Sequence, residues 1–80
     1  MKLPRDLSGP ELAKALSRFG YQVTLQSGSH MRLSTIQEGQ HHITIPNHAS
    51  LRVGTLAAIL SEVAAHFQIS RELLTQKLFG

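Results

Sequence analysis

His30 and Arg32 are the side chains of this sequence whose types and spacing best fit chemistry. His30 follows Gly28 and Ser29 and stands two positions before Arg32, in a segment that alternates polar and apolar residues. Side chains two positions apart on a strand share one face, so an imidazole and a guanidinium would lie side by side. An imidazole titrates near neutral pH and can take a proton from a sugar hydroxyl, and a guanidinium can hold a phosphate and stabilise charge in a transition state. The pair is compatible with chemistry on a sugar–phosphate chain, but residue type alone favours a plain surface histidine in a hairpin.

The other chemistry-bearing residues do not predict a metal site. The chain has five histidines and no cysteine, which excludes thiolate zinc sites, iron–sulfur clusters and disulfides. His41 and His42 are adjacent in a predicted strand, so they must point to opposite faces, and the sequence holds no HxH or HxxxH pair. Neither a Ser/His/Asp triad spacing nor a carboxylate pair is present. We expect no metal and no other cofactor.

The charge is modestly basic, with a formal net charge of +3 that lies entirely within residues 1–37. Such an excess suits an anionic partner such as nucleic acid, and a basic surface kept for solubility explains it equally well. Lys14 and Arg18 form a small basic ridge on the first predicted helix, and His48 lies in a loop. Each of these three residues could contact a phosphate. The alternative for Lys14 and Arg18 is an ordinary solvated surface, and for His48 a hydrogen bond to the backbone of its loop.

Helical spacing predicts where the first element begins and ends. Ser8 and Glu11 form a capping box, in which each side chain accepts from the other residue's amide. Leu12, Leu16 and Phe19 then recur at helical spacing, and Gly20 ends the helix.

From residue 21 the apolar period becomes two, which predicts three strands joined by short loops as an antiparallel meander. Tyr21, Val23 and Leu25 form the apolar side of the first strand, and Met31, Leu33, Ile43 and Ile45 form those of the next two. The opposite, polar face would carry the following residues: Gln22, Thr24, Gln26, His30, Arg32, His42 and Thr44. His41 should point toward the apolar face.

Two further helices complete the chain, one from about residue 53 to 67 and a short one from 71 to 78 with Ser70 as its N-cap. The predicted fold class is α+β, a double-stranded-RNA-binding-domain-like α-β-β-β-α arrangement. Its three-stranded antiparallel sheet carries two helices on one face, followed by a short C-terminal helix. We expect one domain over residues 1–80, with a core at about 3–67 and a helical appendage at about 70–79. No apolar run is long enough to span a membrane and no secretory signal is present, so a cytoplasmic location is expected.

Several short motifs together resemble the HicA family of toxins from bacterial type II toxin–antitoxin systems. They are Leu7-Ser8-Gly9, Gly28-Ser29-His30, Ile45-Pro46-Asn47-His48, and Gly54-Thr55-Leu56 followed by Ile59-Leu60. Their order and spacing agree over about residues 3–67. The resemblance implies the same fold, a small ribonuclease that cleaves mRNA with His30 as its catalytic histidine, and a HicB-type antitoxin that binds the toxin and covers the active site. His48 matches a second family histidine without a firm role.

The sequence hypothesis is therefore a metal-independent endoribonuclease in which His30 activates a ribose 2′-hydroxyl. Arg32 would position the phosphodiester, and the remaining candidate RNA contacts are Ser29, Lys14, Arg18 and His48. A non-catalytic RNA-binding module is the first alternative, since the fold and charge suit it equally. A protein-interaction domain that uses its polar sheet face is the second.

Overall fold

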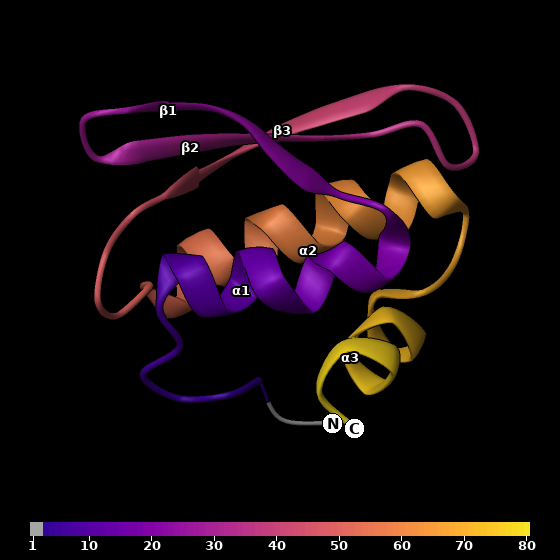
Figure 1. Ribbon diagram of the computed structural model, residues 1–80. Coiled ribbons are helices and arrows are strands. Elements are labelled where there is room, and N and C mark those ends of the chain that lie inside the picture. Colours follow the sequence, from indigo (N-terminus) through magenta and orange to yellow (C-terminus); the bar gives the residue numbers. More distant parts are fainter. Residues whose placement is uncertain (1–2) are drawn as a thin grey trace.

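The computed structural model describes residues 3–80 and shows the expected order of elements (Figure 1). In chain order they are α1 (Gly9–Leu16), the 3-10 turn η1 (Ser17–Phe19), β1 (Gln22–Ser27), β2 (His30–Thr35), β3 (His41–Pro46), α2 (Val53–Phe67) and α3 (Arg71–Phe79). The strands form one antiparallel sheet in the order β1-β2-β3. The predicted α-β-β-β-α class with an added C-terminal helix is confirmed.

Local sequence signals explain the boundaries of α1. The Ser8 hydroxyl accepts from the amide of Glu11 at 3.1 Å, and the Glu11 carboxylate accepts from the amide of Ser8 at 2.9 Å. This is the predicted capping box, which satisfies two amides that no helical carbonyl can reach. Gly20 ends η1 with a φ of 83°, a left-handed conformation that glycine adopts without a steric penalty.

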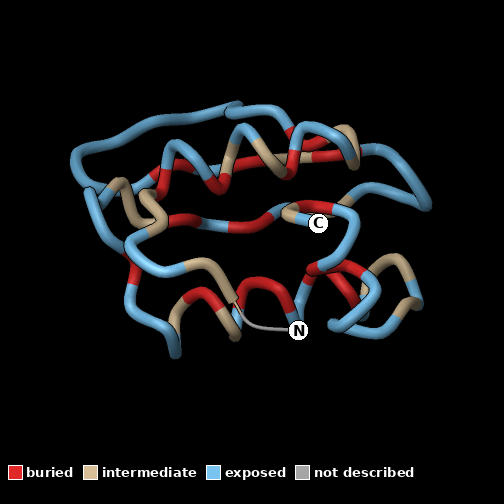
Figure 2. The backbone as a smooth tube through the Cα atoms, turned by 90° about the horizontal axis from the view of Figure 1, so that it is seen from below, coloured by how far each residue is buried: buried red, intermediate tan, exposed pale blue. Residues whose placement is uncertain are grey.

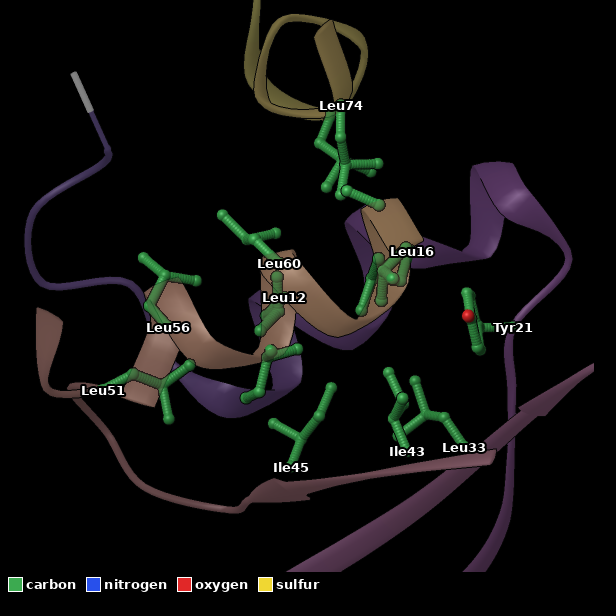
Figure 3. Packing of buried hydrophobic residues seen from close by; sticks show 14 of the residues in the cluster. Leu12, Leu16, Tyr21, Leu33, Ile43, Ile45, Leu51, Leu56, Leu60 and Leu74 are labelled. Carbon is green, nitrogen blue, oxygen red and sulfur yellow. The ribbon is translucent and has the colours of Figure 1, made fainter. Parts of the chain in front are cut away.

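Helices α1 and α2 both lie on one side of the sheet, which we call the inner face (Figure 1). Leu33, Ile43 and Ile45 of the strands meet Leu12 and Leu16 of α1 and Leu56 and Leu60 of α2 there, and all are almost fully buried (Figure 3). On the opposite side, the outer face, no helix among residues 3–80 covers the strands (Figure 1). The outer face is therefore the open surface of the sheet.

Strand β1 corrects one part of the sequence interpretation. Val23 pairs with Leu33, but Leu25 pairs with Arg32, so the register shifts by one residue at Thr24. This β-bulge turns Leu25 to the outer face, whereas the alternating pattern predicted it on the inner one. The expected outward position of Gln26 is wrong for the same reason, since Gln26 pairs with inward-facing Met31.

The predicted half-burial of β1 is also wrong. Val23 is 47% exposed and Leu25 58% exposed, and every residue of the strand is classed as exposed (Figure 2). β1 and β3 are both edge strands of the sheet, but β3 packs against both α1 and α2, whereas β1 packs mainly against α1 and so has less helical surface to cover it. Only Tyr21, just before the strand, is buried as the pattern predicts.

Helix α3 lies against the helical layer on its side away from the sheet (Figure 1). Ser70 caps it as predicted, by accepting from the amide of Leu73 at 3.0 Å. Leu74 and Leu78 are buried in the same apolar cluster as α1 and α2, so α3 contributes to the common core. No single helix in residues 3–80 is long and apolar enough to cross a membrane; α2 and α3 pass that test only jointly, across a bend of 105°.

Candidate active site

His30 is the first residue of the central strand and is exposed on the outer face. A two-residue turn, Gly28-Ser29, leads into it, and Gly28 has a φ of 57°, which favours glycine. The Ser29 hydroxyl lies 3.4 Å from Nδ1 of His30, at the long end of hydrogen bonding. The imidazole is thus accessible and held only loosely by the protein.

A shallow depression of about 170 Å³ surrounds this histidine on the outer face. We call it the outer-face hollow, and its lining residues are Leu25, Ser27, His30, Arg32 and Thr44. The three strands each contribute to it because Leu25 pairs with Arg32, which pairs in turn with Thr44. The predicted neighbours His30 and Arg32 do share this surface. None of the five lining side chains is a carboxylate, so the hollow suits an anion.

The sequence interpretation had not connected Leu25, Ser27 and Thr44 with His30. Thr44 was expected on the same face, but its alignment with Arg32 depends on the register of β2 with β3. Nothing in the sequence indicates that Leu25 lies on the outer face, because the residues from Gln22 to Ser27 alternate regularly and do not reveal the bulge.

Ser29 and the loop that carries His48 meet at one corner of the sheet. The amide of Asn47 donates to the carbonyl of Ser29 at 2.6 Å. The carbonyl of His48 accepts from the amide of Gly9 at 2.9 Å, while the residue itself is exposed. The loop is therefore tied to the turn before His30 and to the start of α1.

Lys14 and Arg18 lie on a different surface from His30. Both line a depression between α1 and α3, together with Glu11, Ser17 and Leu78. The Arg18 guanidinium donates to the carbonyl of Lys77 at 2.9 Å and to that of Leu78 at 3.4 Å, at the end of α3. The structure therefore does not bring these two cations together with His30 and Arg32.

Two other histidines form a cluster on the inner side of the sheet. The rings of His41 and His66 stack with centroids 4.4 Å apart, and Nδ1 of His41 lies 2.7 Å from the Tyr21 hydroxyl. Nε2 of His66 lies 2.9 Å from the carbonyl of Gln37 and 3.1 Å from that of Gly39. The predicted inward direction of His41 is confirmed, and these rings join α2 to the loop between β2 and β3.

Burial perturbs both partners of the Tyr21–His41 contact. Desolvation, with a contribution from nearby Glu62, raises the pKa of Tyr21 to about 12, so its hydroxyl stays protonated in the hydrogen bond with Nδ1 of His41. Desolvation first, and then His66, lowers the pKa of His41 below 6.5. At neutral pH His41 is thus a neutral hydrogen-bonding partner of Tyr21 within the fold.

His42 lies on the outer face but at the other end of β3 from the hollow. Its Nδ1 is hydrogen-bonded to the Ser34 hydroxyl, which lies 3.2 Å from the Thr24 hydroxyl. Among residues 3–80 no group of three His, Asp or Glu side chains is placed to hold a metal ion.

Comparison with known proteins gives one match. The family described as "HicA toxin of bacterial toxin-antitoxin" matches residues 9–64. No curated protein and no solved structure matches this chain significantly. The matched range begins at the first residue of α1 and ends within α2, and so includes the whole sheet and the outer-face hollow. Because it covers well over half of the chain, this protein belongs to the HicA family, the toxins of bacterial toxin–antitoxin systems.

Proposed function

We propose that this toxin is a metal-independent endoribonuclease that acts on mRNA through the outer-face hollow. The observation that carries the proposal is the position of His30 and Arg32, which line one exposed depression without a carboxylate among its lining residues. An exposed imidazole can exchange protons at neutral pH, and a guanidinium beside it can bind a phosphate. Membership in a toxin family supports the same reading.

In the proposed reaction, His30 removes the proton of a ribose 2′-hydroxyl as general base. The 2′-oxygen attacks the adjacent phosphorus, the bond from phosphorus to the 5′-oxygen breaks, and the leaving oxygen takes up a proton. The products are a 2′,3′-cyclic phosphate and a 5′-hydroxyl. Arg32 offsets the negative charge that gathers on the phosphoryl oxygens in the transition state.

Ser29 and His48 would contact flanking phosphates from the adjacent corner of the sheet. Ser29 precedes His30 directly, and the hydrogen bond from Asn47 to Ser29 holds the His48 loop at that corner. Lys14 and Arg18 lie between α1 and α3, so we assign them no part in the reacting site.

The test uses three end-labelled oligonucleotides of one sequence in the presence of EDTA. The first is RNA, the second is RNA with a single 2′-deoxyribose at the cleaved position, and the third is DNA. We expect cleavage of the RNA alone, with a cyclic phosphate on the 5′ fragment, because only RNA supplies the attacking hydroxyl. Cleavage of the DNA, or loss of RNA cleavage on adding EDTA, would contradict the mechanism. RNA binding at low salt without any cleavage would instead favour the non-catalytic RNA-binding module.

A toxin of this class has an antitoxin partner. We propose that the partner is a HicB-type protein that covers the outer face, since this is the open face of the sheet on which the hollow lies. An equimolar amount of such an antitoxin should stop RNA cleavage and prevent RNA binding. Cleavage by the saturated complex at the rate of the free toxin would contradict this part of the proposal.

A further inference from the structure

The β-bulge at Thr24 has a chemical consequence for the candidate active site. It places the side chain of Leu25 on the outer face, directly across from Arg32, instead of on the inner face with Leu33. Leu25 is 58% exposed and is the one large apolar residue among the five that line the outer-face hollow. A group that covers this side chain removes apolar surface from water, which is favourable in free energy.

The surroundings of Leu25 limit what that covering group can be. The hollow beside it measures about 170 Å³, well below the 300 Å³ or more that is typical of pockets for drug-sized ligands. Its polar groups are the hydroxyls of Ser27 and Thr44 and the imidazole of His30, and Arg32 supplies the guanidinium. A small, flat, partly apolar group that is attached to an anion fits these features, as a nucleobase with its phosphate does.

We propose that Leu25 is a base-binding residue, on which one unpaired nucleobase of the RNA substrate packs while Arg32 holds the neighbouring phosphate. The inference rests on the proposed function and adds its substrate class, namely single-stranded RNA. In a duplex the bases are stacked and paired, and a protein reaches mainly the backbone and the groove edges. A base that is free to leave the stack can cover an apolar side chain, as in other single-strand sites.

The matched variants are Leu25→Thr and Val23→Thr. Both remove apolar surface from an exposed position of β1 and introduce the same β-branched residue, which suits a strand. They differ in direction, because Val23 pairs with Leu33 on the inner side and Leu25 pairs with Arg32 on the outer side. Leu25→Phe is the third variant, which enlarges the surface available for stacking.

The measurement is the Kd for a fluorescent single-stranded RNA and for the same sequence as a perfect duplex, with each variant made in a His30→Ala background to prevent cleavage. Melting temperatures establish that each variant is folded. We expect Leu25→Thr to weaken single-strand binding by about fivefold and Leu25→Phe to strengthen it by about threefold, from the loss or gain of contact with the base. Val23→Thr should leave the single-strand Kd unchanged, and duplex binding should not respond to any of the three.

Equal effects of Leu25→Thr and Val23→Thr, or equal loss of single-strand and duplex binding, would overturn the base-binding role of Leu25. An unchanged RNA Kd with weakened antitoxin binding would overturn it as well and would assign Leu25 to the protein interface. In both cases RNA cleavage by the otherwise unaltered toxin would show that the proposed function stands. Absence of RNA binding and cleavage in the parent protein would overturn both proposals together.

Discussion

The backbone of Gly9 lies so close to the carbonyl of Pro46 that a β-carbon at Gly9 would collide with it. Gly9 is buried in the first turn of α1, where its amide also donates to the carbonyl of His48 at 2.9 Å. Close approach of two backbones, and not a turn or a positive φ, is what requires glycine here. The contact fixes the loop that links β3 with α2 and, through Asn47, the turn before His30.

Gly9→Ala is expected to destabilise the protein by about 1–3 kcal/mol, since the added methyl group must displace backbone atoms. For a domain of this size, each kcal/mol corresponds to a decrease in Tm of about 4–8 °C. Gly54→Ala is the matched control, because Gly54 also lies in the first turn of a helix but has nothing within 4 Å of a built β-carbon. Thermal unfolding with an unchanged Tm for Gly9→Ala would show that the close approach is absent.

The stability of the fold should decrease in acid because of His41. Its pKa in the folded protein lies below the ordinary 6.5, through burial and the stacked His66, with a smaller lowering contribution from His42 and an opposing one from Glu62. As the pH falls through 6.5, the unfolded chain takes up a proton that the folded chain does not, so the free energy of unfolding falls until the pH reaches the folded pKa. Above pH 6.5 the shifted pKa of His41 makes its full contribution to the free energy of unfolding.

Urea titrations at pH 7.5 and pH 5.5 measure this effect. The parent protein should unfold at a lower urea concentration at pH 5.5, and His41→Phe should show a smaller difference between the two pH values. His48→Gln, in the exposed loop after β3, serves as the control and should behave like the parent, because His48 is not among the groups that shift the pKa of His41. A His41→Phe protein with the full pH dependence would contradict this role of His41.

Arg32 should govern the salt dependence of RNA binding. Removing one phosphate contact to a single strand lowers the slope of log K against log salt concentration by about 0.7. We therefore expect Arg32→Gln to weaken binding and to reduce the slope by that amount. Lys77→Gln removes the same charge from α3 and should leave the slope unchanged. Equal slopes for Arg32→Gln and the parent would mean that Arg32 does not contact phosphate.

Arg18 is expected to act on stability and not on RNA. Arg18→Met keeps the aliphatic stem but removes the donors that reach the carbonyls of Lys77 and Leu78, at a cost of about 0.5–1 kcal/mol. Lys14→Met, about one turn earlier in α1, should change the Tm less. Measurement of Tm and of RNA Kd together checks this, and a lower RNA affinity at unchanged Tm would contradict the assignment.

The sequence was sufficient where a residue's role depends on its neighbours along the chain. The Ser8–Glu11 box and the Ser70 cap are local, and so is the alternation that places His30 beside Arg32. The motif Gly28-Ser29-His30 was enough to place that histidine at the start of β2.

The sequence was insufficient where a role depends on register or on contacts between distant elements. The bulge at Thr24 inserts one residue without disturbing the alternating pattern, so the pattern predicts the wrong face for Leu25. The basic ridge of Lys14 and Arg18 was visible, but its position beside α3 follows from how the C-terminal helix docks on the core. Gly9 belongs to the Leu7-Ser8-Gly9 motif, but only its close approach to the carbonyl of Pro46 explains why glycine is required there.

The role of His30 as general base is the central claim, and one comparison tests it most directly. Purified parent protein, His30→Ala and His42→Ala are incubated with an end-labelled single-stranded RNA in EDTA, after circular dichroism has shown that all three are folded. His42 is the control because it is an exposed histidine on the same face of the neighbouring strand, outside the outer-face hollow. We predict that His30→Ala lowers the cleavage rate by about 100-fold or more, as expected for loss of a general base, and that His42→Ala cleaves like the parent. Cleavage by His30→Ala at the rate of the parent would contradict the account.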